Sequence, residues 1–207
     1  MSDLDHLVLA TPDFETTLAT ITRQLGVEPV EGGRHDGRGT RNYLLGLGGD
    51  DVYLEIIGPD ETQPEPARPR PFGIDTLTEA HLAGWVARTS DIEGALSRAA
   101  KIGFPSGEAT DMSRTRPDGV TLNWRIALRD FKQPVEVVPF LIDWGASEHP
   151  AAALPQAKLV SFSATHPAFR AVNAVLKTFD TSIALTPGIR PTLIATIEGP
   201  AGTLTLT

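Results

Sequence analysis

Two apolar stretches decide the fold: Leu4-Asp5-His6-Leu7-Val8-Leu9-Ala10 and Val52-Tyr53-Leu54-Glu55-Ile56-Ile57-Gly58-Pro59. Both have the length and apolar content of a strand, and each carries one chemically active side chain, His6 or Glu55. Because side chains alternate along a strand, His6 shares a face with Val8, and Glu55 shares a face with Tyr53. Each polar group therefore lies on an otherwise apolar strand, where it is a potential metal ligand or catalytic group.

The segment between these strands supplies a helix and two further strand signals. Phe14, Leu18, Ile21 and Leu25 recur at helical spacing, and Gly26 ends the pattern. A glycine-rich run from residue 30 leads into a strand over Thr40–Leu47, and a Gly-Gly-Asp turn leads into the strand that holds Glu55. The expected order is βαβββ.

This order recurs further along the chain. A strand over His81–Thr89 precedes a helix that ends at Gly103. The polar stretch that follows, Ser106–Gly119, is expected to hold turns. Two further strands are expected over Thr121–Leu128 and Val135–Ile142. We expect modules over residues 1–60 and 79–145, a Pro-rich linker over 61–78, a second linker over 146–157, and a shorter third module over 158–207. The third module is too small for a core of its own, so we expect it to pack on the other two or across a homodimer.

Composition excludes several classes of protein. The formal net charge of −8 and the lack of any basic run argue against nucleic acid as a partner. The chain has no cysteine, which excludes disulfides, thiolate metal sites and thiol nucleophiles. No apolar run approaches the roughly 18 residues of a membrane span, and the N-terminus lacks a signal-peptide pattern, so we expect a cytoplasmic protein.

Four segments give the sequence a family resemblance: residues 4–10, 33–42, 53–58 and 139–144. Together with the repeated βαβββ order, they resemble the glyoxalase-like domain proteins of the vicinal oxygen chelate superfamily (glyoxalase, bleomycin resistance protein, dioxygenase). The resemblance implies an α+β fold in which tandem βαβββ modules form a half-open, mixed β-barrel-like sheet flanked by helices. It also implies a small-molecule cavity inside the curl of that sheet.

In metal-dependent members of this superfamily, first-strand and fourth-strand side chains hold a divalent metal. His6 and Glu55 match these positions in the first module, so the resemblance implies Zn, Ni, Mn or Fe there, or no metal at all. In the second module the counterpart of His6 is Gly84 or Trp85, and the counterpart of Glu55 is Glu136 or Phe140, depending on the alignment. Glu136 is thus a candidate third ligand, although a solvated acid on an edge strand is the simpler interpretation.

Other interpretations of these residues do not require a metal. A mutual hydrogen bond would satisfy His6 and Glu55 equally well, since a buried carboxylate needs a partner. An exposed loop is the ordinary place for His35, and core packing is the ordinary role of Trp on a strand. As a functional hypothesis, the cavity is lined by five candidate substrate-binding residues: His35, Asn42, Trp85, Trp124 and Phe140.

The sequence thus predicts a glyoxalase-like protein that binds a small oxygenated organic substrate. It would act as a lyase, isomerase or dioxygenase, with His6 and Glu55 as metal ligands or as an acid/base pair. The alternative is a metal-free protein that binds and sequesters a drug or a metabolite.

Overall fold

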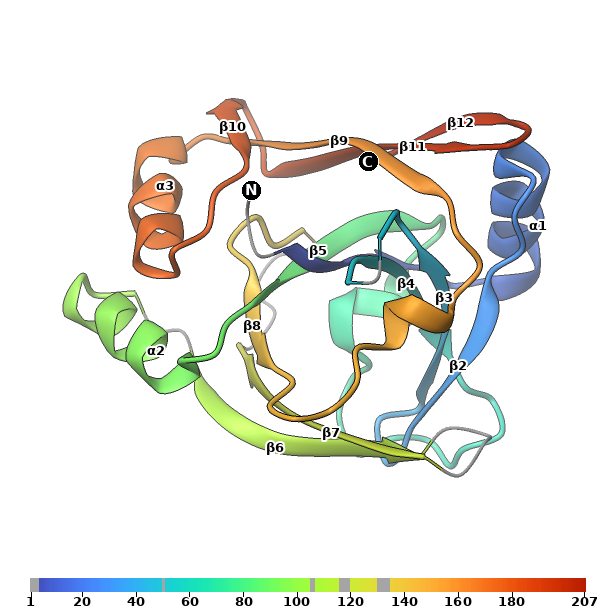
Figure 1. Cartoon of the computed structure of the whole chain (residues 1–207), viewed down its shortest axis with the longest axis horizontal. Coiled ribbons are helices and arrows are strands. Elements are labelled where there is room, and N and C mark those ends of the chain that lie inside the picture. Colours follow the sequence, from blue (N-terminus) through green and yellow to red (C-terminus); the bar gives the residue numbers. More distant parts are fainter. Residues whose placement is uncertain (1–3, 50, 105–106, 116–119, 130–134) are drawn as a thin grey trace.

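A curled, mixed sheet of eight strands forms the centre of the computed structural model, which describes residues 4–49, 51–104, 107–115, 120–129 and 135–207 (Figure 1). The strand order is β2-β3-β4-β1-β5-β8-β7-β6. Its first half comprises β1 (Leu4–Ala10), α1 (Phe14–Leu25), β2 (Val30–His35), β3 (Thr40–Gly46) and β4 (Tyr53–Pro59). Its second half comprises β5 (His81–Arg88), α2 (Ile92–Lys101), β6 (Glu108–Thr115), β7 (Thr121–Leu128) and β8 (Phe140–Asp143).

The two halves have the same internal arrangement. In each, the first and last strands are parallel (β1 with β4, β5 with β8), and the halves meet at the antiparallel pair β1–β5. In each, an aspartate caps the helix: the side chain of Asp13 accepts from Thr16 N, and that of Asp91 accepts from Gly94 N. The structure confirms the α+β class and the half-open sheet built from repeated βαβββ units.

The polar stretch after α2 differs from the sequence expectation. Instead of turns, Glu108–Thr115 forms the edge strand β6, which pairs with β7 along its whole length. The sequence Glu-Ala-Thr-Asp-Met-Ser-Arg-Thr has little apolar content because an edge strand exposes much of its surface. Part of the predicted polar stretch, residues 105–106 and 116–119, lies outside the described residues.

The C-terminal part forms a second, four-stranded sheet. It comprises β9 (Lys158–His166), α3 (Phe169–Thr178), β10 (Ala184–Pro187), β11 (Thr192–Gly199) and β12 (Gly202–Leu206), with the strand order β10-β9-β11-β12. The order along the chain repeats βαβββ, but the strand pairing differs from that in the two halves of the large sheet. Here the first strand, β9, pairs with β10 and β11 and not with the last strand, β12.

This second sheet packs on the outer face of the large sheet, as Figure 1 shows. Phe162 on β9 meets the edge of Trp85 on β5, with ring centroids 5.5 Å apart, and Leu82 N donates to Thr207 O at 3.0 Å. Of the two packing arrangements expected for the third module, the structure shows the one within the same chain.

Apolar side chains fill both faces of the large sheet. The outer face, which includes Leu7, Leu54 and Trp85, packs against the helices and the second sheet. The inner face carries a separate cluster that includes Val8, Val86 and Phe140. Within the described part of the chain, no helix combines the length and the apolar character needed to cross a membrane.

Candidate active site

The inner face of the large sheet encloses a cavity of about 120 Å³ whose two walls differ in chemistry. From the first half, the polar lining residues are His6, His35, Arg38, Thr40, Asn42 and Glu55. From the second half, the described lining residues are apolar or aromatic, among them Met112, Trp124, Ile126, Leu128, Phe140 and Trp144. A ligand in this cavity therefore meets hydrogen-bonding groups on one side and an apolar wall on the other.

A carboxylate that does not line the cavity orients His6. The β1–β5 pairing is irregular between Leu4 and His6, and such a bulge interrupts the strict alternation of side chains. Asp5 and His6 can therefore meet, with Asp5 Oδ1 2.7 Å from His6 Nδ1. Because an ionised carboxylate only accepts hydrogen bonds, Nδ1 of His6 carries a proton. The other ring nitrogen, Nε2, is left facing the cavity.

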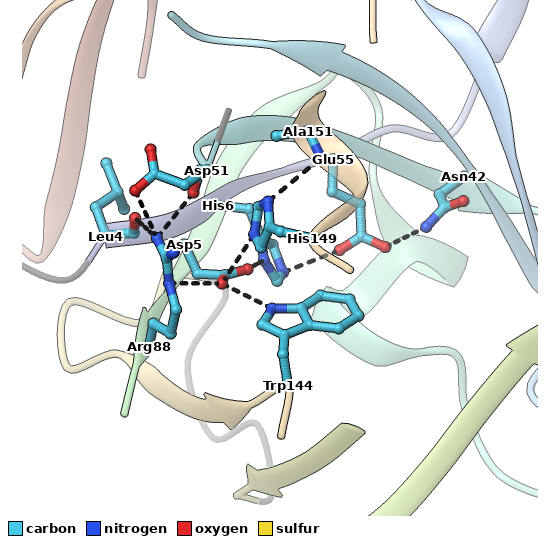
Figure 2. A network of polar contacts seen from close by, with 10 residues as sticks. All are labelled: Leu4, Asp5, His6, Asn42, Asp51, Glu55, Arg88, Trp144, His149 and Ala151. Atoms are coloured by element: carbon cyan, nitrogen blue, oxygen red, sulfur yellow. Dashed lines mark hydrogen bonds and ion pairs between the residues drawn. The ribbon is translucent and has the colours of Figure 1, made fainter. Parts of the chain in front are cut away.

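Asp5 is fully buried and is the centre of the polar network in Figure 2. Its Oδ2 accepts from Trp144 Nε1 at 2.9 Å and from His149 Nε2 at 3.1 Å, and it lies 3.4 Å from Arg88 Nε. Burial by itself raises the pKa of Asp5, but the hydrogen bonds from His149 and His6 outweigh it and hold the pKa well below its ordinary value. Asp5 is thus a fixed anion behind His6.

Glu55 lies next to His6 and is held at one of its oxygens. Asn42 Nδ2 donates to Oε1 at 2.6 Å, and Oε2 lies 3.6 Å from His6 Nε2. That second distance is too long for a hydrogen bond. Tyr53 stacks on His6 with ring centroids 4.6 Å apart and so limits the tilt of the imidazole. His6 Nε2 and Glu55 Oε2 are therefore adjacent and not bonded to each other.

His35 and Asn42 extend this polar wall along the β2–β3 hairpin. His35 Nδ1 lies 2.9 Å from Thr40 Oγ1, and its Nε2 lies 3.4 Å from Asn42 Nδ2 and 3.7 Å from Glu55 Oε1. Asn42 Oδ1 is buried and has no hydrogen-bond partner among the described residues. Both side chains line the cavity.

Two of the predicted site residues lie elsewhere. Trp85 faces the outer side of the sheet, where it is fully buried and its Nε1 donates to Val137 O at 2.7 Å. Strand alternation explains this placement, because Gly84 and Val86 take the inner face. Glu136 precedes β8, does not line the cavity, and pairs with Arg129 at 3.4 Å. Trp124 and Phe140 do line the cavity.

The pairing of the strands identifies the counterparts of His6 and Glu55 in the second half. His6 precedes the cap Asp13 by as many residues as Gly84 precedes the cap Asp91. On the parallel strands, Val8 pairs with Glu55, and its counterpart Val86 pairs with Phe140. The two metal positions that the resemblance implies for the second half are therefore Gly84 and Phe140, and neither side chain can bind a metal.

The surrounding packing also works against a metal bound between the two halves. A Cβ added at Gly84 would lie 3.3 Å from the Phe140 ring and 3.6 Å from the Phe72 ring, so aromatic carbon fills the space of the missing ligands. Within the described residues, no group of three or more His, Asp or Glu side chains is placed to hold a metal. The donor set of the described residues therefore does not fit the metal centre that the resemblance implies.

Sequence reasoning missed the residues that the linkers bring to the site. His149, which the sequence places beside turn residues, precedes the 3₁₀ helix η2 (Pro150–Ala153) and reaches Asp5. Phe72 lies in the 3₁₀ segment η1 (Pro71–Thr76), inside the predicted featureless linker, and lines the cavity. Its φ of 58° is unusual for a bulky residue, and no pattern in the sequence predicts this backbone conformation. The aromatic neighbours Phe72 and Phe140 lie 6.2 Å apart, edge to face.

Comparison with known proteins supports the family resemblance. A family model described as a glyoxalase-like domain matches residues 4–179. No curated protein matches the sequence.

Solved structures align with the chain at low sequence identity. A hypothetical protein from Staphylococcus aureus aligns with a TM-score of 0.62 and 14% identity over 99% of this chain and 84% of its own. Methylmalonyl-CoA epimerase from Mycobacterium tuberculosis aligns with a TM-score of 0.45 and 17% identity over 69% of this chain and 88% of its own. A Streptomyces coelicolor methylmalonyl-CoA epimerase variant in complex with 2-nitronate-propionyl-CoA aligns with a TM-score of 0.46 and 15% identity over 72% and 99%.

Proposed function

This chain belongs to the glyoxalase-like domain family, and we propose that its cavity binds a small oxygenated organic molecule on which His6 and Glu55 move a proton. One observation carries the proposal: His6 Nε2 and Glu55 Oε2 lie 3.6 Å apart, both side chains line the cavity, and the two atoms are not hydrogen-bonded to each other. Two adjacent titratable atoms that are open to the same ligand are the minimal equipment for general acid–base catalysis.

The neighbours of these two residues give each a separate role. Asp5 holds the proton of His6 on Nδ1, which directs Nε2 at the ligand. Asn42 holds Oε1 of Glu55, which leaves Oε2 to take a proton. In a carbonyl compound, Glu55 would remove a proton from the carbon next to the carbonyl. His6, with a second proton on Nε2 and Asp5 as its counter-ion, would donate a hydrogen bond to the oxygen on which negative charge develops. Both an isomerase and a lyase begin with these steps. An isomerase then returns the proton from Glu55 to a neighbouring atom, and a lyase instead releases a leaving group from the next carbon, so these are the enzyme classes that the site supports best.

A second candidate function is binding without catalysis. The observation that favours it is the second half of the cavity, where Gly84 and Phe140 occupy the metal positions and Trp124 adds further aromatic surface. Such a wall favours a ligand with a flat apolar part whether or not any chemistry follows. In that case Glu55 is a structural acid held by Asn42.

The exchange of ligand protons with solvent separates the two candidates. We would treat the protein with a chelator, incubate it in D₂O with a panel of small 2-oxo acids and ketones, and follow the loss of the proton next to the carbonyl by NMR. Glu55→Gln should slow exchange by about 10²-fold or more, the typical contribution of a general base. Glu31→Gln is the control, because Glu31 is exposed on β2 and pairs with Arg41.

Each result of this experiment has a clear meaning. Exchange that survives chelation, persists in Glu31→Gln and is lost in Glu55→Gln supports proton transfer by the cavity. Ligands that bind without exchange would support the binding protein instead. Exchange that chelation abolishes and added metal restores would contradict the proposal that His6 and Glu55 move the proton without a metal.

Two further sequence expectations stay predictions, namely the homodimer and the cytoplasmic location. The C-terminal sheet covers the outer face of its own chain, so a partner is not needed to bury that face. Sedimentation of the full chain tests the dimer, and a monomer at high protein concentration would contradict it.

A further inference from the structure

We propose that the ligand is a small carboxylic acid with a ring-sized apolar tail, bound with its carboxylate at Arg38 and its tail on the second half of the sheet. This inference rests on the proposed function, since it names the class of molecule for that cavity. Its first support is the division of the lining: the polar residues come from the first half, and the described residues of the second half are apolar or aromatic. A ligand that satisfies both walls has one polar end and one apolar end.

The volume and the shape of the apolar wall limit the tail. An apolar cavity of about 150 Å³ accommodates benzene, so the cavity of about 120 Å³ limits the buried tail to at most one ring or a short branched chain. Trp124 and Trp144 lie 5.4 Å apart in a tilted pair on this wall, and Phe140 and Phe72 form the edge-to-face pair described above. Flat faces of this kind favour a planar tail over an extended chain.

Phe72 strengthens the case that this wall is built for a ligand. Its left-handed backbone conformation is unfavourable for a bulky residue. The surrounding structure holds Phe72 there with its ring buried on the cavity side, against Phe140. Strained residues of this kind gather at ligand-binding sites.

The carboxylate is inferred from a comparison of three arginines on or between β2 and β3. Arg34 lies 3.7 Å from Asp60, and Arg41 lies 3.6 Å from Glu31 and stacks on the ring of Phe14 at 5.1 Å. Arg38 is exposed and lines the cavity, and it makes no ion pair with any described carboxylate. A guanidinium at a cavity opening, not neutralised by the described part of the chain, is suited to a planar carboxylate.

The charge of Glu55 fixes the direction of binding. A ligand carboxylate beside Glu55 would be repelled, whereas Arg38 at the hairpin attracts it. The carboxylate is therefore expected at the hairpin end of the cavity. The atoms next to it would then face Glu55 and His6, and the ring would lie against Trp124 and Phe140.

Binding measurements with matched probes test this inference. We would titrate the full chain with phenylacetate, phenylacetamide and acetate by calorimetry and by the fluorescence of the cavity tryptophans. Phenylacetate should bind more tightly than both other probes, because acetate lacks the ring and phenylacetamide lacks the charge. Arg38→Met should weaken phenylacetate at least tenfold and leave phenylacetamide unchanged, whereas Arg34→Met should change neither.

The outcomes separate this inference from the proposed proton transfer. Equal binding of phenylacetate and phenylacetamide, an equal effect of Arg34→Met, or no binding of phenylacetate at millimolar concentration would overturn the carboxylate assignment. Binding of phenylacetate that depends on Arg38 supports the assignment even if no compound in the exchange panel exchanges, a result that would overturn only the proton transfer.

Discussion

Replacing Asp5 by Asn tests the buried network most sharply. The change keeps the shape of the side chain but removes its charge and turns one acceptor oxygen into a donor. Oδ1 of Asp5 accepts from His6, and Oδ2 accepts from Trp144 and His149. Whichever way the Asn amide is turned, at least one of these donors loses its acceptor inside the protein.

The magnitude follows from this loss. Hydrogen bonds to a charged group contribute about 1.5–3 kcal/mol each, and breaking a buried ion pair by removing one partner costs about 3–5 kcal/mol. We therefore expect Asp5→Asn to lower the free energy of unfolding by about 3 kcal/mol or more at neutral pH. Asp36→Asn, on the exposed β2–β3 turn, is the matched control and should change it by less than about 0.5 kcal/mol.

The pH dependence gives this prediction a second test. The pKa of Asp5 is lower in the folded chain than in the unfolded chain, so the stability that its charge provides is complete above about pH 4 and is lost as the pH falls toward the folded-state pKa. Urea unfolding at about pH 7 and about pH 3 should show the difference between the wild type and Asp5→Asn shrinking at the lower pH. If the free energy of unfolding of Asp5→Asn at pH 7 lies less than about 1 kcal/mol below that of the wild type, or if the difference is independent of pH, the charge of Asp5 does not stabilise this network.

Other predictions concern the two faces of the large sheet and the contact between the C-terminal sheet and α1. The double variant Gly84→His, Phe140→Glu should gain Zn²⁺ or Ni²⁺ binding in calorimetric titrations relative to the wild type, and equal metal affinity of the two proteins would contradict the assigned counterparts. Trp85→Phe should lower the free energy of unfolding in urea by about 2 kcal/mol, because the carbonyl of Val137 loses its donor. The affinity for phenylacetate should stay unchanged, and a lower affinity would place Trp85 in the site. Gly199→Ala should lower the free energy of unfolding by about 2 kcal/mol or more, because its new Cβ would overlap the backbone oxygen of Leu25. An unchanged melting temperature would contradict this prediction and show that α1 shifts to make room.

The fold followed from the sequence because its signals are local and repeated. The apolar runs around His6 and Glu55, the helical spacing of Ile21 and Leu25, and the stop at Gly26 each reflect a short-range preference, and all agree with the observed elements. The edge strand β6 was missed because an edge strand needs little apolar content. The pairing within the C-terminal sheet was not predicted because order along the chain does not fix which strands become neighbours.

Single residues of the candidate site were predictable in both halves, since Trp124 and Phe140 line the cavity as His6 and Glu55 do. Strand alternation brought His6 and Glu55 to one cavity, but it assigns Asp5 to the opposite face, and only the β-bulge joins Asp5 to His6. The choice between Gly84 and Trp85, and between Phe140 and Glu136, needed the strand register, because a shift of one residue reverses the face of a side chain. His149 reaches the site through a tertiary contact that no local pattern encodes.

The proposed proton transfer depends most directly on the state of the His6 ring, with Nδ1 protonated toward Asp5 and Nε2 open to the cavity beside Glu55. The ¹⁵N spectrum of histidine-labelled protein measures this, with the His6 signals assigned by their loss in His6→Asn. The proposed proton transfer requires a protonated Nδ1 and an Nε2 signal that shifts when a cavity ligand is added. An unprotonated Nδ1, or an Nε2 signal that no bound ligand changes, would contradict it.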